Sequence, residues 1–232
     1  MVIGGVQNIS FIDFPGRISC VLFLSGCNFH CPYCHNPELA RGLAADQPLP
    51  TLDEFYAFLA ARGSLLEGVV VSGGEPTLQA GLPDVCAAVK RLGFPVKLDT
   101  NGSRPDVLRQ LLAERLVDYV AMDIKTDPRR YVPVFQGEDA QEAITASIRI
   151  IMASAPAYEF RTTCARPIID EDVIAAIARL IDGADRYVLQ PFQDQRLLNP
   201  SFFHRIDPAF TGEQMLRLKM VAQRWVKHCT IR

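Results

Sequence analysis

Six short apolar runs, each followed by a longer amphipathic stretch, constrain the fold of this 232-residue chain more than any other feature. The runs are rich in valine and isoleucine and mostly apolar on both faces, which is typical of strands buried in a parallel sheet. Strict alternation of strand and helix predicts an α/β fold built from right-handed βαβ units. We expect the strands at Ile18–Leu24, Gly68–Ser72, Val96–Asp99, Tyr119–Asp123, Tyr158–Thr163 and Arg186–Gln190.

The stretches between these strands have helical spacing and helix-end signals. Thr51 and Glu54 form the pattern of a capping box, and Gly93 is placed as a C-terminal signal. We expect helices at Leu52–Arg62, Leu82–Leu92, Pro105–Glu114, Ala140–Met152, Asp172–Ile181 and Gly212–Lys227.

Polar motifs follow nearly every strand, and in parallel barrels the loops at that end build the active site. The pattern therefore favours a partial (β/α)6 barrel over an open doubly wound sheet. We expect a single domain over residues 1–232, with a core at about 15–195 and a closing loop and helix at 196–232.

The balance of residue types indicates an ordinary globular protein, with 49% hydrophobic residues, 22% charged residues and a net charge of −2. No long basic run is present, which argues against a nucleic-acid partner. We find neither a signal-peptide pattern nor an apolar stretch of about 18 residues, so we expect a cytoplasmic protein without a membrane partner. Four of the seven cysteines are isolated and are expected to be small buried apolar residues: Cys20, Cys86, Cys164 and Cys229.

The other three cysteines, Cys27, Cys31 and Cys34, lie in one loop directly after the first strand. Thiolates are the natural ligands of iron–sulfur clusters, and three of them hold three irons of a 4Fe–4S cluster and leave the fourth open to a ligand. Two alternatives are a structural zinc site completed by His30 or His35, and reduced thiols without metal. Structural zinc sites usually combine two CxxC or Cys/His elements, and only one pair is obvious here, which favours the cluster.

The spacing of this loop, C-x3-C-x-aromatic-C with Tyr33 as the aromatic residue, resembles the signature of the radical S-adenosylmethionine (SAM) superfamily. Three further motifs follow successive strands in the order that this family shows: SGGEP at 72–76, DTNG at 99–102 and DIK at 123–125. The resemblance covers roughly residues 1–200. It implies an enzyme in which SAM chelates the open iron, one electron breaks the sulfonium bond, and methionine and a 5′-deoxyadenosyl radical form.

Within that superfamily the chain resembles the glycyl-radical-enzyme activating proteins, through the GCNFHCPYCHNPE loop, the opening GGVQNISFIDFPGRISCVLFLSGC, and the DTNG and DIK motifs. Among these it is similar to the anaerobic ribonucleoside-triphosphate reductase activating proteins. The resemblance implies a partner glycyl radical enzyme whose glycine loses a hydrogen atom, and a small electron-donor protein such as flavodoxin or ferredoxin. Some relatives insert a cysteine-rich module between the first loop and the second strand. Here that interval has no cysteine, so one cluster is expected.

The GGEP segment and the aromatic residue of the cysteine loop are expected to face SAM. Gly73 and Gly74 let the backbone approach the ligand without a clash from Cβ. Glu75 is expected to accept hydrogen bonds from the amino group of SAM, the alternative being a surface carboxylate at a helix start. Tyr33 is expected beside the adenine, unless it only packs within its loop.

Three longer polar side chains are expected to reach the same ligand. Lys125 suits the methionine carboxylate because it is a compact point charge, unless it is a solvated lysine paired with Asp127. Arg161, on the fifth strand, either contacts a carboxylate in the site or closes a structural ion pair. Gln190, at the end of the sixth strand, is placed to touch the nucleoside.

Asp99, Thr100 and Asn101 end one strand and Asp123 ends the next, so their side chains are expected at the same barrel mouth. Two carboxylates there repel each other unless a cation or a cationic ligand lies between them. The resemblance implies a monovalent cation beside the methionine carboxylate, held by Asp99 and Asp123 with an oxygen from Thr100. The alternative is that Lys125 alone neutralises both carboxylates.

A barrel of six strands is open along one side, which leaves room for a glycine loop of a partner protein. Phe202, Phe203 and His204, in the loop Asp194–Pro208, form an aromatic group that is expected either to dock this partner or to pack against the last helix. Two other functions stay open. One is a radical SAM enzyme acting on a small metabolite such as a purine-like precursor, and the other is a non-enzymatic zinc- or cluster-binding regulator.

Overall fold

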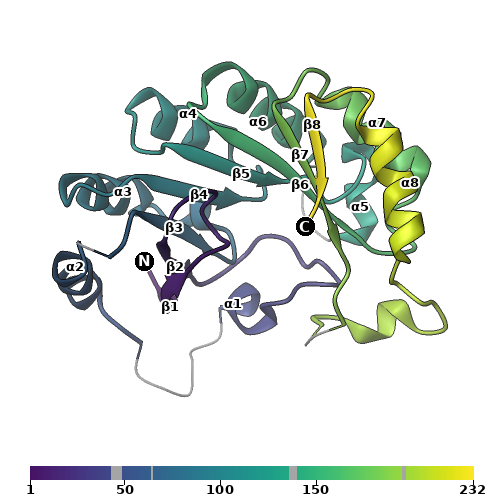
Figure 1. The fold of residues 1–232 in the computed structure, drawn as a ribbon. Coiled ribbons are helices and arrows are strands. Elements are labelled where there is room, and N and C mark those ends of the chain that lie inside the picture. The colour runs from purple at the N-terminus through teal and green to yellow at the C-terminus, as the bar shows by residue number, and fades with distance from the viewer. Residues whose placement is uncertain (43–48, 64, 136–139, 195–196) are drawn as a thin grey trace.

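The computed structural model describes residues 1–42, 49–63, 65–135, 140–194 and 197–232. Its centre is one eight-stranded sheet whose strands follow their order along the chain (Figure 1). The first pair of strands is antiparallel and every later pair is parallel. The strands are β1 (Ile3–Ser10), β2 (Ser19–Leu24), β3 (Gly68–Gly73), β4 (Val96–Thr100), β5 (Tyr119–Asp123), β6 (Tyr158–Cys164), β7 (Arg186–Pro191) and β8 (His228–Ile231).

The predicted α/β class is confirmed, and β2 to β7 are the six expected parallel strands, each within about one residue of its predicted bounds. The expectation of six strands was incomplete, because β1 and β8 extend the sheet at its two edges. β1 contains two glycines and several polar residues, which obscure a strand pattern, and β8 is too short to show a period. In the part of the sheet that the structure describes, β1 and β8 do not pair with each other, so the curve stays open.

The longer helices connect the parallel strands and lie along the outer side of the curved sheet (Figure 1). They are α2 (Leu52–Ala61), α3 (Leu82–Arg91), α4 (Pro105–Ala113), α6 (Gln141–Ser154), α7 (Glu171–Leu180) and α8 (Gly212–Ala222). The loops hold the short helices α1 (Pro37–Arg41) and α5 (Tyr131–Val134) and the 3-10 turns η1 (Pro76–Leu78), η2 (Pro128–Arg130) and η3 (Pro200–Phe203).

The ends of the helices follow their sequence signals with one exception. The capping box of α2, formed by Thr51 and Glu54, is present. The last helix ends at Ala222 rather than at the predicted Lys227, because the Lys227 amide donates to the Ala184 carbonyl as the chain turns into β8. Over the described ranges, no helix combines the length and the apolar character that crossing a bilayer requires.

The two faces of the sheet differ in chemistry. Val71, Leu98 and Val120 point toward the helices and are fully buried in the main core. Because neighbouring strand positions point to opposite faces, Lys97 and Glu159 lie on the inner face, where they are 1% and 0% exposed. The expectation that these strands are mostly apolar on both faces therefore holds only in part for the inner face, which carries buried charge as well as the apolar Val21 and Val70.

Phe14, from the loop between β1 and β2, packs against the inner face near the amino-terminal ends of the strands. Its ring lies 5.9 Å from the ring of Tyr119 and forms a small second cluster that includes Val21 and Val70. A Cβ on Gly68 would lie 2.8 Å from the Phe14 ring, so this strand position needs glycine unless the ring moves. The aromatic packing thus fills one end of the interior, and the polar motifs occupy the other.

Candidate active site

The carboxyl-terminal ends of the strands and the cysteine loop enclose a cavity of about 370 Å³. Its walls contain every residue predicted for the site: Cys27, Cys31, Tyr33, Cys34, Gly73, Gly74, Glu75, Asp99, Thr100, Asn101, Asp123, Lys125, Arg161 and Gln190. They also contain side chains for which the sequence predicts no role toward SAM: Asp13, Phe23, Phe29, His35, Asn36, Ala40, Ser72 and Thr163. The fold therefore brings the separate motifs to one place.

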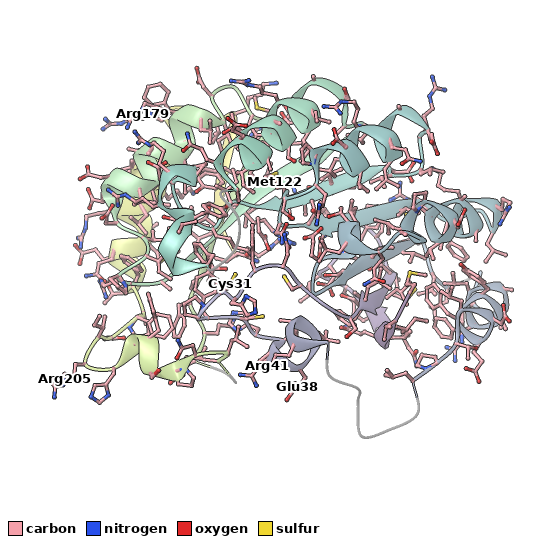
Figure 2. All side chains as sticks on the ribbon, turned by 180° about the vertical axis from the view of Figure 1, so that it is seen from behind. Cys31, Glu38, Arg41, Met122, Arg179 and Arg205 are labelled. Carbon is pink, nitrogen blue, oxygen red and sulfur yellow. The ribbon has the colours of Figure 1, made fainter. Side chains whose placement is uncertain are left out.

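The cysteine loop leaves β2 and is held by the helix that follows it, α1. The Gly26 amide donates to the Leu39 carbonyl at 2.7 Å, which fixes the start of the loop. In Figure 2, Cys31 lies between the sheet, where Met122 is labelled, and α1, which carries Arg41. The loop thus forms one wall of the cavity opposite the strand ends.

The three loop thiols line the same cavity, and each is a free cysteine. Burial raises the pKa of Cys27 to about 11 and the pKa of Cys31 to about 12, so both thiols are neutral near pH 7 without metal. Among the described residues no three His, Cys, Asp or Glu side chains are grouped closely enough to hold a metal ion, and this applies to the three thiols as well as to His30 and His35. Metal binding has to displace the thiol protons and draw the sulfurs together.

The four isolated cysteines occupy the buried positions predicted for them. Cys20, Cys86 and Cys164 are 0% exposed and Cys229 is 8% exposed. Burial raises the pKa of Cys86 and Cys164 to about 12, which disfavours a reactive thiolate at either site.

Gly73 and Gly74 bring the end of β3 against the cysteine loop. Gly73 has a φ of +129°, and a Cβ there would lie 2.1 Å from the carbonyl oxygen of Leu24. A Cβ on Gly74 would lie 2.1 Å from the carbonyl oxygen of Gly26. The amides of Gly74 and Glu75 donate to these two carbonyls, each at 2.8 Å. The close approach of two backbone segments of the chain therefore requires both glycines, and their expected approach to the ligand stays a prediction.

Glu75 is 1% exposed, which excludes the alternative of a surface carboxylate. Its Oε1 accepts hydrogen bonds from the Thr77 amide at 3.1 Å and the Thr100 hydroxyl at 2.7 Å, and its Oε2 accepts from the Asn101 amide at 2.6 Å. Burial raises the pKa of Glu75, and these hydrogen bonds offset part of the rise. Glu75 therefore ties the loop after β3 to the end of β4.

Asn101 connects the end of β4 to the cysteine loop. Its Nδ2 donates to Asn28 Oδ1 at 3.0 Å and lies 3.9 Å from Cys27 Sγ. Asn28 in turn donates through its Nδ2 to the Ser103 hydroxyl at 2.9 Å. Sequence reasoning missed Asn28, since only its place directly after a cysteine singles it out. The DTNG segment and the cysteine loop form one hydrogen-bonded unit.

Asp99 and Asp123 share Arg161, which lies directly opposite Asp123 in the register of β5 and β6. The Arg161 Nη1 lies 3.3 Å from Asp99 Oδ1, and its Nε donates to Asp123 Oδ1 at 2.7 Å. Lys125 donates to Asp123 Oδ2 at 2.8 Å, and Lys97 pairs with Asp99. Arg161 therefore lines the cavity and closes an ion-pair network with Asp99 and Asp123, while a contact with the ligand stays a prediction.

Burial by itself would raise the pKa of Asp99 and of Asp123. The Arg161 guanidinium together with a lysine, Lys97 at Asp99 and Lys125 at Asp123, outweighs this effect, and the pKa values of both carboxyl groups lie below their ordinary value of 3.8. The alternative of a solvated Lys125 paired with Asp127 is wrong, because the Lys125 side chain is 15% exposed and pairs with Asp123. Arg161, rather than Lys125 alone, separates the two carboxylates.

Tyr33 and Gln190 both line the cavity. Tyr33 is 3% exposed, and its ring lies 6.2 Å from the ring of Phe135. Its hydroxyl has no hydrogen-bond partner among the residues that the structure describes. Gln190 lies beside Thr163 in the register of β6 and β7. Because a buried hydroxyl without a hydrogen-bond partner is costly, we expect an atom of the ligand to form a hydrogen bond with the Tyr33 hydroxyl.

The aromatic group of the C-terminal loop is not a uniformly exposed patch. Phe203 is 7% exposed, and its ring lies 5.4 Å from the ring of Phe192. Phe202 is half-buried and His204 is exposed. Phe203 is therefore packed against Phe192, directly after β7, and the expected packing against the last helix stays a prediction. Residues 195 and 196 of this predicted loop lie outside the described ranges.

Known proteins are similar to this chain in sequence and in fold. A family model described as the Radical SAM superfamily matches residues 21–180. A Methanocaldococcus jannaschii protein provisionally named a glycyl-radical enzyme activating enzyme is 32% identical over 240 residues, which cover 100% of this chain and 95% of that protein. The pyruvate formate-lyase-activating enzyme of Clostridium pasteurianum is 34% identical over 134 residues, which are 54% of each chain.

Among solved structures, Streptococcus suis SuiB superposes with a TM-score of 0.65 at 13% identity, over 91% of this chain and 48% of SuiB. That likeness concerns the fold alone, whereas the family model and the archaeal relative extend to the sequence. The chain therefore belongs to the radical SAM superfamily and, within it, to the glycyl-radical-enzyme activating enzymes.

Proposed function

We propose that this radical SAM enzyme takes a hydrogen atom from a glycine of a partner glycyl radical enzyme, and that the partner is an anaerobic ribonucleoside-triphosphate reductase. The observation that carries the proposal is the single cavity lined by all the residues predicted to hold the cluster and SAM. We propose further that residues 1–232 form one domain and that the enzyme works in the cytoplasm.

The cavity suits one 4Fe–4S cluster because of its donor set. Cys27, Cys31 and Cys34 would hold three irons, and the loop has no fourth cysteine. When bound, the cluster would supply one electron to SAM, whose sulfonium bond to the 5′ carbon breaks to give methionine and the 5′-deoxyadenosyl radical. A small electron-donor protein such as flavodoxin or ferredoxin would replace that electron.

The charged wall of the cavity suits the methionine carboxylate of SAM. Lys125 and Arg161 line the cavity, and Lys97 lies behind them on the same face of the sheet. Together these three cations outnumber the carboxylates of Asp99 and Asp123, so this wall is net positive and suits an anionic group, and two further carboxylates, of Asp13 and Glu75, also line the cavity.

The uncharged wall would hold the rest of SAM. The Tyr33 hydroxyl lacks a partner among the described residues and would lie beside the adenine. Gln190 would touch the nucleoside from β7. Glu75 Oε2 accepts one backbone hydrogen bond and keeps capacity for the amino group. Gly73 and Gly74 would keep the backbone of this loop near the ligand.

A glycine loop suits the proposed reaction for two reasons. The radical left on a glycine α-carbon is stabilised by the flanking amides, and a residue without a side chain lets its loop bend into a deep site. The cavity walls would hold the reacting atoms close and exclude water, which saves the entropy of bringing them together. In the described sheet β1 and β8 are separate edges, and we propose that the partner loop enters on that open side.

Two measurements test the proposal. Reconstituted and reduced protein incubated with SAM should release 5′-deoxyadenosine, which liquid chromatography quantifies. The same mixture with an anaerobic ribonucleotide reductase should give a persistent glycyl doublet in electron paramagnetic resonance. If 5′-deoxyadenosine forms only while a free metabolite is turned over, and no glycyl enzyme acquires a radical, the small-metabolite alternative replaces the activase.

A further inference from the structure

Both oxygens of the Asp99 carboxylate already accept hydrogen bonds from donors of the chain. Its Oδ1 accepts from Lys97 and Arg161, and its Oδ2 accepts from the Ser72 hydroxyl at 3.0 Å. A sodium or potassium ion bound to these oxygens would have to share them with a cationic side chain or displace the Ser72 hydroxyl.

Both oxygens of the Asp123 carboxylate are likewise paired with cationic side chains. Its Oδ1 accepts from Arg161 Nε at 2.7 Å and its Oδ2 accepts from Lys125 Nζ at 2.8 Å. The network around the two aspartates therefore contains three cationic side chains and two carboxylates. It has one positive charge in excess before any ion is added.

Lys97 is the residue that creates this excess. Its side chain is 1% exposed and lies behind Asp99, outside the set of residues that line the cavity. A buried ammonium needs a carboxylate partner, so Asp99 is committed to Lys97. The buried carboxylate of Glu159 does not relieve the excess, because it pairs with Arg232 at 2.8 Å. A further cation at Asp99 would lie beside a buried positive charge with little water to screen it.

We propose that Arg161 and Lys97 take the place of the monovalent cation expected between Asp99 and Asp123, so that this enzyme binds and cleaves SAM without sodium or potassium. The inference rests on the SAM site proposed above. Arg161 bridges the two carboxylates, and Lys97 acts as a positioning residue that holds Asp99 from behind. The excess positive charge is left for the methionine carboxylate.

The charge balance predicts how a Lys97→Met variant behaves. Without Lys97, the two cationic side chains that remain balance the two carboxylates. One bound sodium or potassium ion then restores the single excess positive charge of the unmodified protein. The variant should bind SAM about tenfold more tightly in potassium than in tetramethylammonium, which is too bulky to enter. Lys97→Arg keeps the charge and should stay indifferent to the ion. Lys90→Met is the matched control, because it removes an ion pair with Asp118 that is about one-third exposed.

The experiment measures SAM affinity by equilibrium dialysis of the anaerobically reconstituted protein. Each buffer contains sodium, potassium or tetramethylammonium as its sole monovalent cation. The unmodified protein and Lys90→Met should show dissociation constants that agree within about twofold across the buffers. The linewidth of the sodium-23 resonance gives a second readout that is independent of SAM. Broadening that potassium reverses is expected for Lys97→Met and not for the unmodified protein.

Two results would overturn the inference. One is a loss of SAM affinity of about tenfold when the unmodified protein is moved into tetramethylammonium. The other is sodium-23 broadening by the unmodified protein that potassium reverses. Both are measured without a variant, so a Lys97→Met protein that fails to fold leaves the test intact. Absence of SAM binding in every buffer would instead contradict the proposed function, and the sodium resonance would still decide the question of the ion.

Discussion

The two halves of the cavity bury their carboxylates in different ways. Beside the cysteine loop, Glu75 accepts its hydrogen bonds from hydroxyl groups and backbone amides, and burial raises its pKa. On β4 and β5, Asp99 and Asp123 share Arg161, and the pKa of each is lowered despite burial. One half is fixed by uncharged donors and the other by ion pairs.

Uncharged hydrogen bonds therefore position the loops of the site, whereas ion pairs set where its charge lies. The uncharged donors join η1, the end of β4 and the cysteine loop without adding a cation next to the thiols. The ion pairs place the positive excess at the strand ends, where the methionine carboxylate is expected, and Lys125 among them also lowers the pKa of Cys31 against the larger effect of burial. A site arranged in this way can attract an anionic group at one end and hold a cluster at the other.

The largest expected effect comes from removing a thiol in the uncharged half. Cys31→Ala should reduce both the iron content of the reconstituted protein and the release of 5′-deoxyadenosine to background, because the open-iron site needs all three thiolates. Iron analysis and chromatography measure the two losses. Cys86→Ala, in the outer core, should keep the cluster and lose about 1 kcal/mol of stability. Full activity in Cys31→Ala would remove that residue from the cluster site.

Breaking the charged half should have the next largest effect. Asp123→Asn leaves Arg161 and Lys125 buried with one carboxylate fewer, which should cost about 3–5 kcal/mol in urea unfolding. Because the pKa of Asp123 is lowered in the folded protein, its stabilisation is present above pH 3.8 and is lost as the pH falls below that value. The variant should therefore lose stability less steeply in acid. An acid profile identical to that of the unmodified protein would argue against the ion pairs.

The uncharged half should respond more weakly and with the opposite dependence on pH. In Glu75→Gln the new side-chain NH2 group faces hydrogen-bond donors such as the Asn101 amide and finds no acceptor there. This mismatch should lower the free energy of unfolding by about 1–3 kcal/mol. Since the pKa of Glu75 is raised in the folded protein, its stabilisation is present below pH 4.5 and declines as the pH rises. Urea unfolding at several pH values should show a cost that is larger near pH 4.5 than near pH 7. If the loss of unfolding free energy in Glu75→Gln instead grew with pH, as expected for Asp123→Asn, the proposed difference between the two halves would be wrong.

The sequence by itself determined the features that short-range patterns encode. The apolar runs predicted β2 to β7 to within about one residue, and the helix signals predicted the capping box of Thr51 and Glu54. The spacing of Cys27, Cys31 and Cys34 and the order of the later motifs pointed to the radical SAM superfamily. These features can be predicted from the sequence because each depends on residues within a few positions of one another along the chain.

Only the tertiary structure decided how the charges inside the site are matched. The register of β5 and β6 places Arg161 opposite Asp123, and the inward pleat of β4 buries Lys97 beside Asp99. Glu75 meets the Asn101 amide only because parallel strands end at the same edge of the sheet. These partners are far apart in sequence, and a shift of register by one residue would turn each to the other face. The pairing therefore depends on the assembled sheet and not on any local pattern.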